Sequence, residues 1–130
     1  MDKFLGIDYG RKKIGLAMGD SDSKLAEPYI VIRFENIYEV LKKVAQVVQV
    51  EHVNKIVLGI SEGKMANEQK GFGKRLHDKL GIEVIYQDET LTTKEAQRLS
   101  IEAGINRKKR KGLEDAYSAA LILQSYLDNL

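Results

Sequence analysis

The first part of the chain alternates short apolar runs with turn residues, a pattern that predicts β-strands. Three runs, Lys3 to Asp8, Ile14 to Met18 and Tyr29 to Phe34, are rich in β-branched and aromatic residues. The segment between the first two runs is short enough for a hairpin, and we expect Gly10 to supply a positive φ in that turn. The pattern therefore predicts three consecutive antiparallel strands.

The middle of the chain combines helical spacing with two further strands. Apolar residues recur at helical intervals from Ile37 to Glu51, with Asn36 as the expected N-cap. A polar helix is expected from about Asn67 to Leu80, between strands at Lys55 to Ile60 and Ile82 to Tyr86. The first of these strands is apolar throughout, which is typical of a strand buried on both faces.

Two helices are expected to close the chain. Thr92 and Glu95 have the spacing of a capping box, which predicts a helix from about Thr93 to Ala103. A second helix, Leu113 to Leu127, is apolar almost all round and should pack against the sheet. This order predicts an α/β fold, with a five-stranded mixed sheet of order 3-2-1-4-5 in which strand 2 is antiparallel, flanked by helices. The length suits one domain over residues 1–130.

Composition and charge narrow the classes of protein to consider. The 43% hydrophobic content supports a core, and the absence of cysteine excludes disulfides, thiolate metal ligands and cysteine nucleophiles. The N-terminus predicts neither a signal peptide nor a membrane span, so we expect a cytoplasmic protein without a membrane partner.

Positive and negative residues nearly balance, at 21 to 19, but Arg107 to Lys111 places five cations in a row. Such a run is most often a solvated loop, yet its position just before an acid-bearing helix favours contact with phosphates.

Three acidic residues stand at the ends of three expected elements. Asp8 closes the first strand, Glu89 follows the fifth, and Asp115 begins the last helix. Ligand sites in open α/β sheets lie beyond the carboxyl ends of the strands, so these side chains can converge on Mg²⁺ or Mn²⁺ and support phosphodiester hydrolysis. Simpler roles remain open, because Asp is common in turns and acids stabilise the first turn of a helix.

Four motifs resemble those of one known family, in the same order and over nearly the whole chain. They are Gly6–Gly15, Val57–Ile60, Asp88–Thr93 and Glu114–Ala116, and they resemble the YqgF family. That family is described as a pre-16S rRNA nuclease, similar to Holliday junction resolvases, with a ribonuclease H-like fold. The resemblance implies hydrolysis of a nucleic-acid backbone, RNA being favoured over DNA, in ribosome biogenesis. The protein is then expected to be a monomer or a homodimer.

The resemblance also implies roles for individual residues. Asp8, Glu89 and Asp115 match the acidic positions of the family, which makes them the expected catalytic residues and metal ligands. Two positions depart from the family pattern, since Ser61 replaces a proline and Thr90 replaces an arginine. Without the guanidinium of that arginine, we expect other cationic side chains to bind the phosphates of the substrate. The expected nucleic-acid-binding residues are Arg11, Lys12, Lys13, Arg107, Lys108, Lys109, Arg110 and Lys111.

Three other functions are compatible with parts of this pattern. A Holliday junction resolvase would apply the same chemistry to branched DNA and would need a dimer with two sites. A catalytically silent nucleic-acid-binding module would keep the cations without the metal chemistry. Residues 6–10 also resemble the first phosphate motif of the actin and sugar-kinase group, but that group needs a second, repeated domain for which 130 residues leave no room.

Overall fold

The first three strands form an antiparallel meander. In the computed structural model, which describes residues 1–89 and 112–130, these strands are β1 (Lys3–Tyr9), β2 (Lys13–Asp20) and β3 (Glu27–Arg33), each paired with the next. The expectation of a positive φ at Gly10 is wrong. Its N–H instead donates to the carbonyl of Lys13 at 3.1 Å, and a Cβ there would stand 2.7 Å from that oxygen. The turn needs glycine because it is tight.

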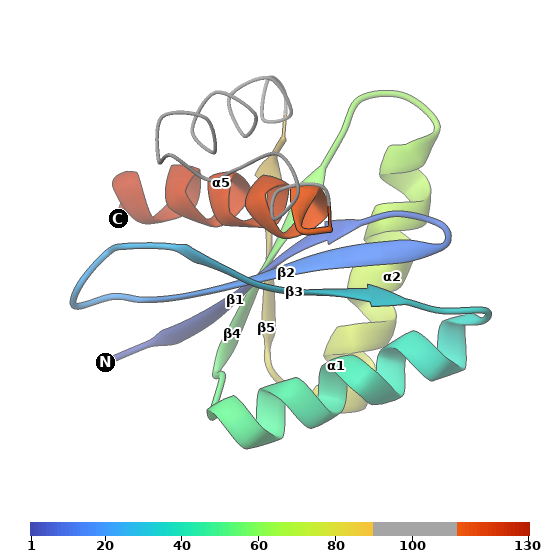
Figure 1. Ribbon diagram of the computed structural model, residues 1–130, viewed down its shortest axis with the longest axis horizontal. Coiled ribbons are helices and arrows are strands. Elements are labelled where there is room, and N and C mark those ends of the chain that lie inside the picture. The colour runs from blue at the N-terminus through green and yellow to red at the C-terminus, as the bar shows by residue number, and fades with distance from the viewer. Residues whose placement is uncertain (90–111) are drawn as a thin grey trace.

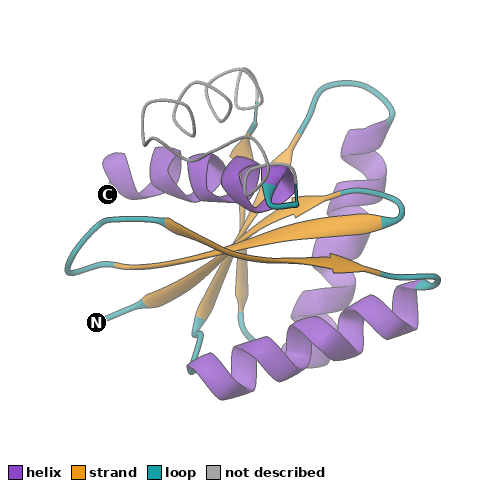
Figure 2. Cartoon of the chain, viewed as in Figure 1, coloured by secondary structure: helices purple, strands orange, loops and turns teal. Residues whose placement is uncertain are grey.

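Two parallel strands complete the sheet on the other side of β1. β4 (Lys55–Ile60) pairs with β1, and β5 (Glu83–Asp88) pairs with β4. The described residues therefore form a five-stranded sheet of order β3-β2-β1-β4-β5, as expected. The strands of this sheet are drawn in orange in Figure 2. Because β1, β4 and β5 run in the same direction, their carboxyl ends meet at one edge of the sheet.

Helices cover both faces of the sheet (Figure 1). The helix α1 (Ile37–Glu51) begins at Asn36, whose side-chain oxygen accepts a backbone N–H at 2.9 Å, as the sequence predicts. The helix α2 (Met65–Leu80) ends at Gly81, which takes the left-handed conformation with φ 69°. These two helices lie on one face, and α5 (Glu114–Asp128) lies on the other. The expected helix from Thr93 to Ala103 lies outside the described residues.

The core is divided by the sheet into two buried clusters. Successive side chains of a strand point to opposite faces, so each inner strand contributes to both clusters. The cluster beneath α1 and α2 includes Leu5, Ile7, Ile14, Leu16, Ile56, Leu58, Phe72 and Leu76. The cluster beneath α5 includes Phe4, Ala17, Val57, Ala119, Ile122, Leu123 and Leu127. By the same alternation Asp8, four residues after Phe4, faces α5.

No helix among residues 1–89 and 112–130 is both long enough and apolar enough to cross a membrane.

Candidate catalytic centre

Asp8 lies at the carboxyl end of β1, on the face that α5 covers. Burial, the negative charges of Glu89 and Asp115, and a hydrogen bond with Glu89 together raise the pKa of Asp8 from 3.8 to about 7. Charges separated by several Debye lengths would not have this effect, so the fold brings the three acids into electrostatic reach of one another. Asp8 and Glu89 form the closest pair of the three.

Glu89 is held from several directions just beyond the end of β5. Its backbone N–H donates to the carbonyl of Ile60 at 3.1 Å, and its Oε1 accepts from the side-chain nitrogen of Gln69 at 3.2 Å. Its Oε2 lies over Gly59, where a Cβ would stand only 2.7 Å from that oxygen. The sequence predicts Asp8 and Glu89 at the same edge of the sheet, and both lie there, at the carboxyl ends of β1 and β5. Gln69 was not among the expected residues.

Asp115 approaches from α5, directly above the β1–β2 pair. Asp8 is paired with Gly15 on β2, and the backbone of Asp115 lies so close to Gly15 that a Cβ there would overlap the Asp115 carbonyl group. The side chain of Asp115 does not point freely into the site, because its Oδ2 forms an ion pair with Nζ of Lys13 at 3.2 Å. Lys13, expected to contact nucleic acid, thus also contacts one of the acids.

The donor chemistry suits a divalent cation. The described residues contain no group of three or more His, Cys, Asp or Glu side chains arranged to hold a metal ion. The closest approach is the pair of Asp8 and Glu89, two half-buried carboxylates whose repulsion is relieved when Asp8 carries a proton. Mg²⁺ prefers oxygen ligands and often uses only one or two carboxylates, so a cation in place of that proton fits the pair. Asp115 pairs with Lys13 through Oδ2, so joining Asp8 and Glu89 would use its Oδ1 or require this ion pair to open.

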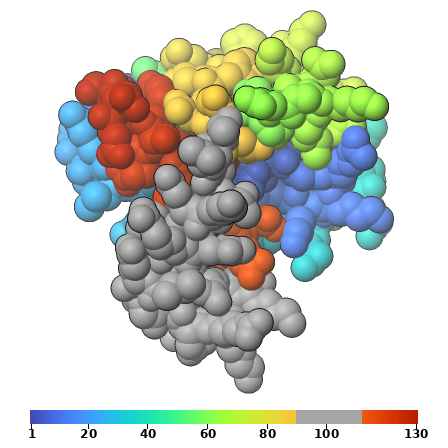
Figure 3. Space-filling view, turned by 90° about the horizontal axis from the view of Figure 1, so that it is seen from above, coloured from blue at the N-terminus to red at the C-terminus, as the bar shows by residue number. Residues whose placement is uncertain are grey.

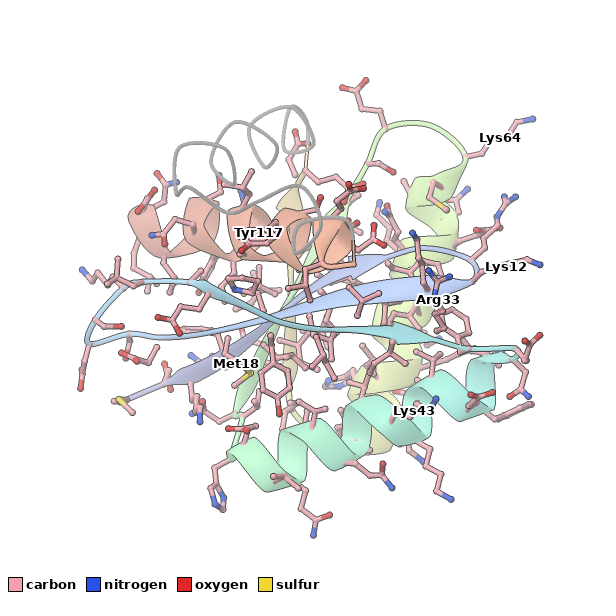
Figure 4. The ribbon with its side chains drawn as sticks, viewed as in Figure 1. Lys12, Met18, Arg33, Lys43, Lys64 and Tyr117 are labelled. Atoms are coloured by element: carbon pink, nitrogen blue, oxygen red, sulfur yellow. The ribbon has the colours of Figure 1, made fainter. Side chains whose placement is uncertain are left out.

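Cations lie in the segments that follow the carboxyl ends of β1 and β4. Arg11 and Lys12 lie at the exposed β1–β2 turn, and Nε of Arg11 forms an ion pair with Glu68 of α2 at 3.0 Å. Figure 4 shows Lys12 extending away from this turn, and Lys64, which the sequence analysis did not single out, extending from the start of α2. The other expected nucleic-acid-binding residues lie outside the described part of the chain: Arg107, Lys108, Lys109, Arg110 and Lys111.

A pocket of about 390 Å³ opens beside Glu89, between the ends of β4 and β5 and the start of α2. Seen from above, the surfaces of these segments, green around residue 65 and yellow around residue 85, lie side by side (Figure 3). The pocket is lined by Ile60, Ser61, Glu62, Lys70, Tyr86 and Asp88. Its volume falls within the range of small-molecule sites, but Asp8, Glu89 and Asp115 are not among the described residues that line it.

Comparison with known sequences gives full-length matches. The model of a family described as "RuvX: Holliday junction resolvase" matches residues 2–129. A protein of Endomicrobium trichonymphae named "Putative pre-16S rRNA nuclease" is 39% identical over 135 residues, which cover 98% of this chain and 96% of the relative. A protein of the same name from Syntrophus aciditrophicus (strain SB) is 39% identical over 132 residues, covering 97% of this chain and 88% of the relative.

Comparison with solved structures gives neighbours that share the fold. RuvC of T. thermophilus, in complex with a Holliday junction substrate, has a TM-score of 0.67 at 14% identity and covers 99% of this chain and 95% of its own. The Fowlpox virus resolvase, in complex with Holliday junction DNA, has a TM-score of 0.65 at 15% identity. The match covers 98% of this chain and 97% of the resolvase chain. These matches confirm the expected ribonuclease H-like fold.

Proposed function

We propose that this chain, which belongs to the RuvX family of Holliday junction resolvases, processes pre-16S rRNA. The family and the full-length relatives make it a nuclease that acts on phosphodiester bonds, and they confirm the resemblance to the YqgF family. The choice of rRNA rests on the name that the relatives carry. A single nuclease domain over residues 1–130, working in the cytoplasm where ribosomes assemble, is part of the proposal.

The arrangement of the acids supports a metal-dependent reaction, which is general among nucleases of this fold. Asp8 and Glu89 are proposed to hold Mg²⁺ or Mn²⁺ directly, with Asp115 as the third acid. When bound, the cation activates water and neutralises charge on the phosphate. The protein positions the carboxylates from three elements and excludes water from the buried side of Asp8. The single observation that carries this proposal is the meeting of Asp8, at the end of β1, with Glu89, just beyond β5, where burial and then the neighbouring acids raise the pKa of Asp8 to about 7.

The substrate is tested by comparing cleavage of three nucleic acids in the presence and absence of Mn²⁺. A pre-16S rRNA fragment, an unrelated single-stranded RNA and a four-way DNA junction are incubated with the protein under the same conditions. We expect the rRNA fragment to be cut fastest, and only when Mn²⁺ is present. Fastest cutting of the DNA junction would contradict the choice of rRNA while leaving the nuclease chemistry intact.

Resolution of Holliday junctions is the second candidate function. The family description and the two neighbours bound to Holliday junctions favour it. Resolution requires two cuts on opposing strands, which a symmetric dimer with two sites provides. Two measurements test this candidate: the mass of the protein in solution with the junction, and whether both opposing strands are cut. Paired cuts by a protein that stays monomeric would rule out this mode of resolution.

Lys12→Ala tests the proposed contact between the exposed turn and phosphates. Neutralising one phosphate contact should reduce the slope of log K against log salt concentration by about 0.7–0.9. The measurement is nucleic-acid affinity at several salt concentrations. Lys43→Ala is the control, because Lys43 lies on α1 and forms an ion pair with Glu39 (Figure 4). An equal change in both variants would show that the turn has no special part in binding.

A further inference from the structure

Gln69 is a polar side chain in a buried position. It is 1% exposed and lies on the same stripe of α2 as Phe72, Gly73 and Leu76, at the helical spacing of a core-facing residue. An amide buried among apolar side chains costs free energy unless its hydrogen bonds are made. The Gln69 amide is therefore expected to form hydrogen bonds with specific partners in this part of the core.

Both ends of the Gln69 amide are hydrogen-bonded. Its oxygen accepts from the backbone N–H of Ser61 at 2.8 Å and from the Ser61 hydroxyl at 3.1 Å. Its nitrogen donates to Oε1 of Glu89 at 3.2 Å. Because a backbone N–H can only donate, the oxygen of the amide has to face Ser61, and the nitrogen then has to face Glu89. The chemistry of the partners thus determines the orientation of the amide.

These contacts restrict where the carboxylate of Glu89 can lie. Oε1 is held by Gln69, and Oε2 lies against Gly59, where even a Cβ would come within 2.7 Å. The backbone of Glu89 is joined to Ile60 at the end of β4. The carboxylate that Gln69 holds is the same one that forms the hydrogen bond with Asp8. A change at Gln69 therefore acts on Glu89 at the point where it meets Asp8.

We propose that Gln69 is a positioning residue, which orients the carboxylate of Glu89 for a divalent cation and links it through Ser61 to the segment between β4 and α2. This inference rests on the proposed metal-dependent function. Residues that hydrogen-bond a metal ligand orient it, and their loss typically lowers metal affinity or activity by 10–100-fold. In the sequence, Gln69 is recognisable only as a polar residue on the apolar stripe of α2, because its hydrogen-bond partners are distant in the chain.

The test replaces Gln69 with methionine, which is similar in length and makes neither hydrogen bond. The variant is made in a Gly71→Ala background, because a Cβ at Gly71 meets nothing within 4 Å and alanine stabilises a helix relative to glycine. Gly71→Ala alone is the matched control. Two quantities are measured: the Mn²⁺ concentration for half-maximal cleavage, and that for the half-maximal rise in melting temperature. Both should increase about 10–100-fold.

The outcomes separate positioning from a purely structural role. A lower melting temperature with unchanged Mn²⁺ half-saturation would show that Gln69 only fills the core, and would overturn the inference. If the methionine variant does not fold, Gln69→Asn takes its place, since its amide is one methylene too short to reach both partners, and the same shift is expected. A control protein without any Mn²⁺-dependent cleavage or stabilisation would overturn the proposed function itself, and the inference with it.

Discussion

Asp8→Asn is expected to slow metal-dependent cleavage by several orders of magnitude while leaving the protein folded. Asparagine has nearly the same shape as aspartate but removes the negative charge that the proposed cation needs. Stabilisation of transition-state charge by a metal is worth several kcal/mol, so the loss of its ligand should reduce the rate by about 10²–10⁴-fold. The measurement is single-turnover cleavage of the RNA fragment in Mn²⁺, with Asp78→Asn, an exposed position on α2, as the control.

The same variant should melt at a higher temperature than the wild type when no metal is present. A carboxyl whose pKa is raised by folding, here from 3.8 to about 7, destabilises the folded state at pH values above its unfolded pKa. The penalty is fully present above pH 7 and disappears as the pH falls through 7 toward 4. At pH 8 the gain on replacing Asp8 is up to about 4 kcal/mol, since one pKa unit corresponds to about 1.4 kcal/mol.

These two readouts together distinguish a functional acid from a structural one. An aspartate that stabilises a turn would lower the melting temperature when replaced, and it would leave the metal response unchanged. For Asp8 we expect the opposite pattern, with a higher melting temperature at pH 8 and a smaller rise on addition of Mn²⁺. Cleavage at the wild-type rate by Asp8→Asn would reject the site assignment.

Gly15→Ala is expected to have the second largest effect, on stability and activity together. The added Cβ would overlap the carbonyl group of Asp115 and come 2.6 Å from the backbone nitrogen of Ala116. Backbone cannot move aside as a flexible side chain can, so the start of α5 has to shift away from the sheet. Overpacking of this kind costs about 1–3 kcal/mol and sometimes more. The shift should also displace Asp115 from Asp8 and slow cleavage.

Melting temperature and cleavage rate are measured for Gly15→Ala beside Gly71→Ala. Both variants add one methyl group, but nothing lies within 4 Å of the Cβ at Gly71, so its melting temperature should stay the same or rise. A normal melting temperature and a normal rate in Gly15→Ala would show that α5 does not need this close approach.

The order and pairing of the strands could be predicted because their signals are local. Alternating apolar residues marked the strands, and the end of α1 at Glu51 and the bounds of β4 at Lys55–Ile60 agree with the sequence prediction. The sheet order follows from short hairpins between the first strands and helical crossovers between the later ones. The placement of Asp8 and Glu89 at one edge follows in turn, since both stand at the carboxyl ends of parallel strands.

The contacts within the centre could not be predicted in the same way. Nothing near Gln69 in the sequence indicates that its amide joins Ser61 to Glu89, because those residues come from different elements. The ion pair between Lys13 and Asp115 was likewise not predicted. Lys13 therefore contacts one of the three acids, in addition to the contact with phosphate that the sequence predicts. The contact of the basic run from Arg107 to Lys111 with phosphates stays a prediction.

The sequence by itself determined which elements form, their order along the sheet, and which acids stand at their ends, because these depend on the spacing of residues close together in the chain. Only the tertiary structure decided how near those acids come to one another. That distance depends on how tightly α5 packs above Gly15 and Gly59, where the absence of a side chain lets Asp115 and Glu89 approach. Such packing depends on the shapes of surfaces that meet only after folding, which no local pattern describes.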